Sequence, residues 1–170
     1  MTAFIALLRA VNVGGTGKLP MTDLVGLAQA AGFERVRTYI ASGNLLFDSD
    51  LPEAEIKQAL EARLAVYAGK PVGVLVRSGA QMAAVAAANP FAQAPPNQVT
   101  AIFLDEAPPA DALALAVGVK GEQMRLGLRE IYVWYGDGQG DSKLKIPAAR
   151  TGTARNMNTV VRLVRMAGEG

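Results

Sequence analysis

The sequence predicts an α+β fold with antiparallel sheets, and three observations support this prediction. Apolar runs of strand length alternate with segments whose apolar residues recur at helical spacing. Two pairs of neighbouring strand patterns are typical of hairpins, residues 35–40 with 45–47 and residues 124–128 with 131–135. The order of elements in the first half then recurs in part in the second half. At 170 residues the chain can hold two small subdomains, since a folded chain of this size buries roughly 70% of its unfolded surface.

The first half contains elements in the order β-α-β-β-α-β. Phe4–Val11 is apolar on both alternating faces, which is typical of a central strand covered on both sides. A helix begins near Pro20 and ends at Gly32, where a left-handed residue is easily accommodated. The remaining elements are the first hairpin, a helix between Pro52 and Gly69, and a strand of residues 72–76. This order is that of the ferredoxin-like arrangement.

The second half repeats this order incompletely. After an alanine-rich helix of residues 81–88, the segment Ala94-Pro95-Pro96-Asn97 is the expected joint between the halves. The elements expected beyond it are a strand of residues 99–104, a short helix of residues 110–117, the second hairpin and a last helix of residues 154–167, with no evident final strand. The predicted fold is therefore two duplicated ferredoxin-like (βαββαβ) subdomains, residues 1–93 and 98–170, with antiparallel sheets and a C-terminal helix.

The amino-acid composition excludes several classes of site. The chain has no Cys and no His, which excludes disulfides, Cys/His zinc sites, Cys nucleophiles and His general bases. Asp137 and Asp141 lack the alternating oxygen ligands of a calcium loop, so we expect a turn there, no metal and no cofactor. No apolar run approaches the roughly 20 residues of a membrane helix. The short run Phe4–Leu8 ends at Arg9 without a signal-peptide cleavage pattern, so we expect a cytoplasmic protein with no membrane partner.

A glycine-rich loop and a turn form the predicted site. The loop after the first strand contributes Asn12, Gly14, Gly15 and Lys18. In the ferredoxin-like order the first and third strands are neighbours, so this loop and the turn Ser42-Gly43-Asn44 should lie at one end of the sheet, beside a helix N-terminus. Free backbone N–H groups, the positive helix end and the cations Arg9 and Lys18 favour a small phosphate- or carboxylate-bearing ligand.

Each part of this site has an alternative explanation. The glycines can serve only to let the chain turn, and Ser42-Gly43-Asn44 is also ordinary turn chemistry. The loop is no nucleotide motif, because Asn12 stands where a Walker loop has its first glycine and Leu19 where it has Ser or Thr. A catalytic Ser42 would need a base such as Lys18 or a carboxylate from elsewhere. Arg9 is either a site residue or half of a structural ion pair, and an enzyme acting on phosphorylated or acyl substrates stays an open alternative.

The C-terminal region is basic although the whole chain is nearly neutral. Residues 141–170 contain six basic and two acidic residues, whereas the net charge of the chain is +2. This excess makes nucleic acid an alternative partner. A solvated helix face is the competing explanation, because no aromatic residues that would stack on bases lie among these charges. The oligomeric state is not indicated by any pattern in the chain.

A distinctive combination of residues extends along nearly the whole chain. They are residues 7–15, Lys18, Met21, Leu24, Gly32-Phe33, residues 36–40, Ser42-Gly43-Asn44 and Phe47, followed by Ser142-Lys143-Leu144 and residues 155–160. This combination resembles the bacterial domain of unknown function 1697 family. The chain departs from the family pattern at Ala10, where Gly is common, and at Met157, where Trp is frequent. The resemblance implies a duplicated ferredoxin-like fold and brings no established activity.

The resemblance adds a second polar cluster at the start of the last helix. Its residues are Arg155, Asn156, Asn158 and Thr159. One cap would satisfy the exposed N–H groups of that helix, so this many polar residues indicate either a ligand site or a buried polar network. The residues of the predicted ligand site are therefore Arg9, Asn12, Gly14, Gly15, Lys18, Ser42 and Asn44, with Arg155, Asn156 and Asn158 as further members.

Overall fold

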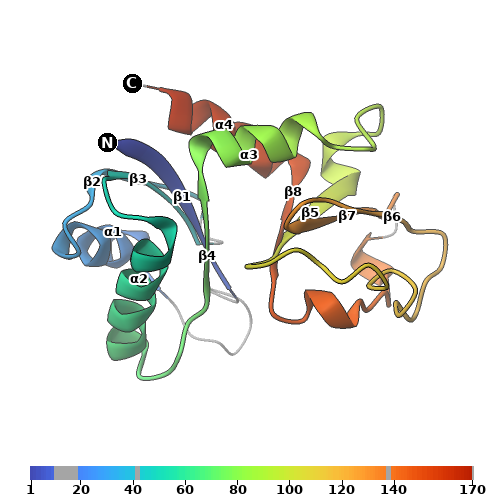
Figure 1. Ribbon diagram of the computed structural model, residues 1–170, viewed down its shortest axis with the longest axis horizontal. Coiled ribbons are helices and arrows are strands. Elements are labelled where there is room, and N and C mark those ends of the chain that lie inside the picture. Colours follow the sequence, from blue (N-terminus) through green and yellow to red (C-terminus); the bar gives the residue numbers. More distant parts are fainter. Residues whose placement is uncertain (10–18, 41–42, 137–138, 170) are drawn as a thin grey trace. The chain divides into compact units, whose positions relative to one another are not determined.

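The fold is a mixed α+β arrangement, seen in a computed structural model that describes residues 1–9, 19–40, 43–136 and 139–169 (Figure 1). Within these ranges the chain forms two four-stranded antiparallel sheets and four α-helices. It divides into two compact units, one of Met1–Met82 with Leu163–Gly170 and one of Ala83–Arg162. The two divisions fall inside the helices α3 (Gly79–Ala87) and α4 (Met157–Gly168). The predicted subdomain limits, residues 1–93 and 98–170, stay a prediction.

The first unit is built on a sheet with the strand order β2-β3-β1-β4. Its strands are β1 (Thr2–Leu8), β2 (Glu34–Tyr39), β3 (Asn44–Ser49) and β4 (Val74–Ser78). The helices α1 (Met21–Ala30) and α2 (Glu53–Ala68) cover one face of this sheet (Figure 1). The core between them includes the stacked rings of Phe33 and Phe47, whose centroids are 4.4 Å apart. Strand β1 is buried from Phe4 to Leu8, as its uniformly apolar sequence predicts.

Prolines and glycines set the limits of both helices. Pro20 and Pro52 immediately precede α1 and α2, where a fixed φ suits the start of a helix. Gly69 ends α2 in the left-handed region with φ of 71°. The acidic residues Glu53 and Glu55 lie in the first turn of α2, where the helix dipole favours negative charge.

The opposite face of the first sheet carries arginines among its apolar residues. Directly paired residues of antiparallel strands point to the same face. The register pairs Arg37 with Leu46, Leu46 with Ile5, and Ile5 with Arg77. Arg77 is only 1% exposed, and its Nη1 donates a hydrogen bond to the carbonyl oxygen of Val76 at 3.0 Å. This face therefore combines a buried apolar surface with fixed positive charge.

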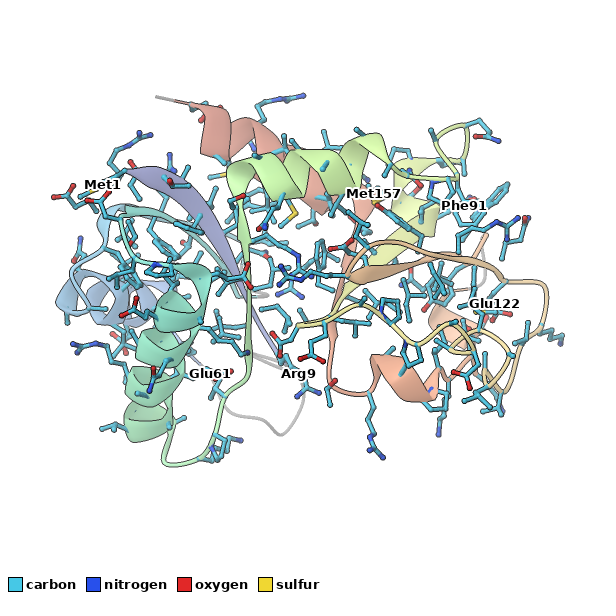
Figure 2. The ribbon with its side chains drawn as sticks, viewed as in Figure 1. Met1, Arg9, Glu61, Phe91, Glu122 and Met157 are labelled. Atoms are coloured by element: carbon cyan, nitrogen blue, oxygen red, sulfur yellow. The ribbon has the colours of Figure 1, made fainter. Side chains whose placement is uncertain are left out.

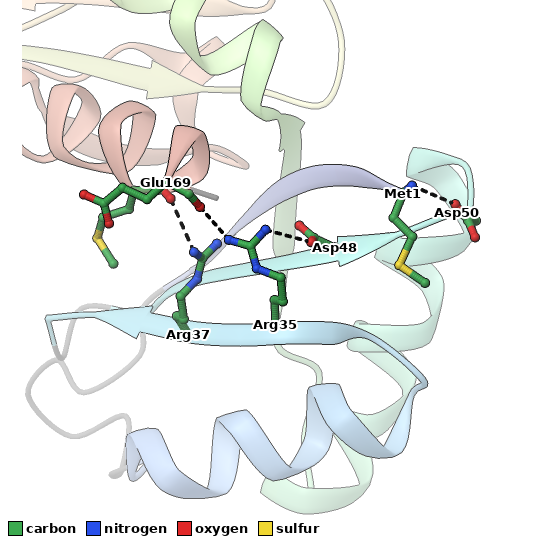
Figure 3. A network of polar contacts seen from close by, with 7 residues as sticks. Met1, Arg35, Arg37, Asp48, Asp50 and Glu169 are labelled. Atoms are coloured by element: carbon green, nitrogen blue, oxygen red, sulfur yellow. Dashed lines mark hydrogen bonds and ion pairs between the residues drawn. The ribbon is translucent and has the colours of Figure 1, made fainter.

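The last turns of α4 are held by two arginines of β2. Arg37 Nη1 donates to the carbonyl oxygen of Met166 at 3.4 Å, and Arg35 Nη2 donates to that of Glu169 (Figure 3). Arg35 also forms an ion pair with Asp48 at 3.3 Å. Cations at a helix C-terminus interact favourably with the free carbonyl groups and the helix dipole. These contacts join the C-terminal segment to the sheet of the first unit.

The second unit contains a sheet with the strand order β6-β7-β5-β8. Its strands are β5 (Val99–Phe103), β6 (Gln123–Leu126), β7 (Glu130–Trp134) and β8 (Thr153–Asn156). When the strands are counted within each unit, both sheets have the order second, third, first, fourth. The apolar core of this unit includes Ile102, Ile131, Val133 and Ile146.

One helix predicted for the second unit is absent. Residues 110–115 form turns, and residues 116–117 are not helical either. The end of this segment is held extended, because Val117 pairs with Lys145 in an isolated bridge. Gly118 follows with φ of 72°, and a Cβ there would lie 2.2 Å from the carbonyl oxygen of Lys143. Such close contact with a neighbouring backbone segment is incompatible with a continuing helix.

The last helix also differs from its prediction, because it begins at Met157 and not at residue 154. The residues before it form β8, which pairs with β5 and supplies the fourth strand that the sequence did not reveal. This strand is short and its sequence, Thr153-Ala154-Arg155-Asn156, is polar. It therefore lacks the apolar alternation that identifies a strand.

Candidate functional site

The start of the predicted loop lies beside the predicted turn in the first unit. The N–H group of Leu8 donates to the carbonyl oxygen of Gly43 at 2.9 Å, and the N–H group of Arg9 donates to that of Gly73 at 2.9 Å. Arg9, Gly43 and Gly73 are therefore neighbours at one end of the sheet. The predicted site residues Asn12, Gly14, Gly15, Lys18 and Ser42 lie outside the described residues.

The side chain of Arg9 is half-buried at the end of β1 (Figure 2). Its aliphatic part lies against Gly73. A Cβ at Gly73 would lie 2.9 Å from Cδ of Arg9. Any larger residue at position 73 would therefore displace this side chain. By strand alternation Arg9 lies on the same face of the sheet as Leu7, which is the face opposite to α1 and α2. The glycine thus provides the space that fixes the course of the guanidinium group.

Asn44 is placed by the turn itself. Its side chain is 0% exposed, and its Nδ2 donates to the carbonyl oxygen of Tyr39 at 2.8 Å. Gly43 has φ of 85°, which favours glycine. These contacts close the hairpin. They support the explanation that Asn44 serves to form the turn. A direct contact between Asn44 and a ligand stays a prediction.

Ile40 is a strained residue next to this turn. It has φ of 51° and is 50% exposed. A β-branched residue in the left-handed region is uncommon, and such strain costs of order 1–3 kcal/mol. Strained residues concentrate at functional sites, so the conformation of Ile40 marks this end of the sheet as a candidate site.

Arg37 is a charged residue near this site that the sequence analysis did not select. It pairs with Leu46, and Leu46 is two residues from Asn44 on the same strand. Arg37 and Asn44 therefore point to the same face of the sheet. Its Nε and Nη2 atoms are buried and have no hydrogen-bond partner among the described residues. The alternation of Arg35, Arg37 and Tyr39 opposite Val36 and Thr38 was the signal in the sequence that places it on this face.

The second predicted cluster lies in the second unit and is largely engaged in local contacts. Arg155 is 8% exposed on β8, and its Nη1 donates to Oγ1 of Thr153 at 3.0 Å and to the carbonyl oxygen of Ala154 at 2.9 Å. Burial lowers the pKa of Arg155 to about 10. Asn156 Oδ1 accepts a hydrogen bond from the N–H group of Thr159 at 3.0 Å and so caps α4, whereas Asn158 is exposed.

The contacts of Arg155 and Asn156 favour the buried polar network over a ligand site for these two residues. Arg155 acts within the sheet, and Asn156 satisfies one free N–H group at the start of α4. Asn158 has the exposure that a ligand contact requires.

The described part of the chain contains neither a metal-binding cluster nor a membrane-spanning helix. No group of three or more Asp and Glu side chains within it is arranged to hold a metal ion. Its helices are all too short or too polar to cross a bilayer.

Comparisons with known proteins identify a family and a similar solved structure. A family model described as a protein of unknown function, DUF1697, matches residues 1–132. A solved structure described as that of the conserved bacterial protein SP0830 from Streptococcus pneumoniae is 24% identical in sequence, with a TM-score of 0.81. The match covers 99% of each chain and shows a common fold. No curated protein sequence matches this chain.

Proposed function

Because the chain belongs to the DUF1697 family, whose description assigns no activity, we propose a function from its residues: it is a cytoplasmic protein that binds a small phosphate- or carboxylate-bearing ligand. The site is at the end of the first sheet, where Arg9, Gly43 and Gly73 meet. The observation that carries this proposal is the hydrogen bond from Leu8 to Gly43, which brings the start of the glycine-rich segment beside the turn.

The charge around this end of the sheet supports an anionic ligand. Helix α1 begins at Met21, three residues after Lys18, and among the described residues its N-cap, Pro20, offers no side-chain hydrogen bond to the first N–H groups. Free N–H groups and the helix dipole favour an anion there. Asp23 in the first turn opposes this effect in part, and its carboxylate accepts a hydrogen bond from Tyr67. The cations Arg9 and Lys18 add positive charge at the end of β1 and before α1.

A thermal-shift screen tests this proposal. Inorganic phosphate, nucleoside monophosphates, sugar phosphates and di- and tricarboxylates would each be added at increasing concentration. A true ligand at 100 times its Kd adds about 2.7 kcal/mol to the free energy of unfolding and raises Tm by several degrees. We expect Lys18→Ala and Arg9→Gln to lose this shift.

Lys143→Ala is the matched control, because Lys143 is an exposed lysine of the second unit. We expect it to keep the full shift. A ligand that stabilises wild-type protein and both Lys18→Ala and Arg9→Gln equally would contradict the proposed site.

We further propose that both units derive from one ferredoxin-like arrangement. Their sheets share the same strand order, and the sheet of the first unit has helices in both crossover positions. In the second unit, turns and two 3₁₀ helices, Gln139–Asp141 and Pro147–Ala149, occupy the described parts of these positions. The anion site would then belong to the unit that has kept both helices.

Nucleic-acid binding through the basic C-terminal region is the second candidate. The observation in its favour is that Arg162 and Arg165 are both exposed on α4, although the buried Arg155 is not part of such a surface. A gel shift at low salt that disappears at high salt and weakens with Arg165→Ala would favour nucleic acid over a small anion.

A further inference from the structure

A groove of about 590 Å³ lies between α1 and α2 in the first unit. Its lining residues are Leu27, Ala59, Ala62, Arg63, Val66 and Tyr67. The helices cover the face of the sheet opposite to Arg9, so this groove is separate from the proposed anion site. Its volume is within the range of roughly 300–1,000 Å³ that is typical of small-molecule sites.

Helix α2 has two apolar faces, and the core accounts for only one of them. Ile56, Leu60 and Leu64 are buried against the sheet at helical spacing. A second row, Ala59, Ala62 and Val66, is spaced by three and four residues, which also places it on one side of the helix, and it lines the groove. A helix with a second apolar face usually has a second partner for it. The two alanines leave the space that larger residues would fill.

The floor and the rim of the groove differ in exposure. Leu27 and Ala59 are partly buried and pack against the core, so they form a rigid apolar floor. Val66, by contrast, is 87% exposed at the rim. A ligand that covers so exposed a valine gains binding free energy, because burial of apolar surface contributes about 25 cal/mol per Å².

The charged groups at the rim select the kind of ligand. Arg63 is exposed, and it has no hydrogen bond or ion pair with any residue in the described ranges. The hydroxyl group of Tyr67, another lining residue, donates a hydrogen bond to Asp23 Oδ2. An unpaired guanidinium group beside an apolar floor is complementary to a carboxylate attached to an apolar body.

We propose that this groove binds a small amphipathic carboxylate of the medium-chain fatty acid class. The alkyl chain lies on Leu27, Ala59, Ala62 and Val66, and the carboxylate accepts hydrogen bonds from Arg63. The site is independent of Arg9 and Lys18.

Titration of the whole protein with octanoate tests this proposal, with octan-1-ol as the uncharged ligand of equal chain length. Isothermal calorimetry or NMR chemical-shift changes would give the two affinities. We expect octanoate to bind about two- to fivefold more tightly than octan-1-ol, since an ion pair with an exposed arginine makes only a modest contribution. Arg63→Gln should abolish this preference and leave octan-1-ol binding unchanged. Asp23→Asn should strengthen octanoate binding, because it removes a like charge and keeps an acceptor for Tyr67.

Two matched leucine variants test the apolar part of the groove. Ala62→Leu fills the exposed side of the groove and should weaken both ligands about tenfold or more. Ala54→Leu makes the same change at an exposed position of α2 outside the groove and should leave both affinities unchanged. Circular dichroism checks that both variants are folded, and Lys18→Ala should bind octanoate as wild type does.

Three outcomes would overturn the proposal. The first is that octanoate does not bind, and the second is that Arg63→Gln binds octanoate as tightly as wild type. The third is that Ala62→Leu changes the oligomeric state measured by light scattering and not the affinity, which would assign the groove to a second copy of the chain. The octanoate measurements do not depend on the thermal-shift screen with Lys18→Ala. The groove and the proposed anion site are therefore tested separately.

Discussion

Arg9 and Gly73 illustrate how one missing side chain positions a functional group. Gly73 has an ordinary backbone conformation, so its role is to leave space and not to adopt a left-handed φ. The guanidinium stem of Arg9 occupies that space at the end of the sheet. The absence of a side chain at position 73 is therefore required for Arg9 to reach the proposed anion site in this conformation.

Gly73→Ala is predicted to impair ligand binding more than stability. The new Cβ would lie 2.9 Å from Cδ of Arg9, and this flexible side chain must move away. We expect the free energy of unfolding to change by less than about 1 kcal/mol and the anion affinity to fall several-fold. Urea unfolding and the thermal-shift titration measure the two effects. Gly26→Ala is the control, because its Cβ would meet no atom within 4 Å, and it should raise stability by about 0.5–1 kcal/mol without altering affinity.

Tyr132 makes the second unit sensitive to alkaline pH. Its hydroxyl group donates to the carbonyl oxygen of Val85 at 2.7 Å, and burial, with the nearby charge of Glu130, raises its pKa to about 12. The unfolded chain ionises this tyrosine near its ordinary pKa of 10, two units lower. The folded state therefore holds more protons between these values, and stability must fall as pH rises from about 10 to 12.

Tyr132→Phe is predicted to remove this pH dependence. At pH 7 the variant should lose about 1 kcal/mol, because the carbonyl group of Val85 loses its buried donor. The difference from wild type should shrink, and then reverse, as pH rises above 10. Urea unfolding at pH 7, 9, 10 and 11 measures it. A difference that stays constant across this series would show that Tyr132 ionises as easily in the folded state as in the unfolded chain.

At the scale of elements, two arginines of β2 contact the C-terminal end of α4, and they differ in how fully their hydrogen-bond donors are satisfied. Arg35 donates to Glu169 and pairs with Asp48, whereas Arg37 makes one long hydrogen bond of 3.4 Å to Met166. Two nitrogen atoms of Arg37 are buried without a partner among the described residues. A buried donor that lacks an acceptor costs about 1–3 kcal/mol, which exceeds the contribution of one weak bond.

Arg37→Met is therefore predicted to leave stability unchanged or to increase it. Methionine has a similar length and brings no unsatisfied donor. Arg35→Met, which removes the bond to Glu169 and the ion pair with Asp48, should instead lower the free energy of unfolding by about 0.5–1 kcal/mol. Urea denaturation of both variants measures this contrast. A loss above about 2 kcal/mol for Arg37→Met would show that its Nε and Nη2 atoms are satisfied in solution.

The elements that could be predicted from the sequence are those whose buried faces produce a clear apolar pattern. Strand β1 is buried on both faces, and α2 buries Ile56, Leu60 and Leu64, so their patterns were unambiguous. Strand β8 could not be recognised, because its stability comes from pairing with β5 and not from an apolar face of its own. Residues 110–117 have helical composition, but contacts with residues 143–145 decide their conformation. Local propensity cannot report such contacts between distant segments.

The candidate site was predicted to a similar extent. Strand order predicted that the loop of residues 12–18 lies beside the turn. The pairing of β1 with β3 brings Leu8 next to Gly43, whereas the loop itself lies outside the described residues. Arg37 was missed because alternation gives its face but not its burial, and the burial of its Nε and Nη2 atoms depends on how segments distant in sequence pack. The groove between α1 and α2 was also missed, since alanines at helical spacing look like ordinary helix formers. Only the packing of two helices shows that those alanines leave a space.

At the scale of the whole molecule, the first unit is discontinuous in sequence. Its main part ends at Met82, and its last eight residues, Leu163–Gly170, follow the entire second unit. During synthesis on the ribosome, the carbonyl groups that Arg35 and Arg37 bind are therefore made only after the entire second unit. Contacts across so many intervening residues slow folding, because the connecting chain must lose conformational freedom before they form. The sheet face that carries Arg37 is thus completed late, and until then it offers nascent-chain chaperones an exposed apolar and basic surface.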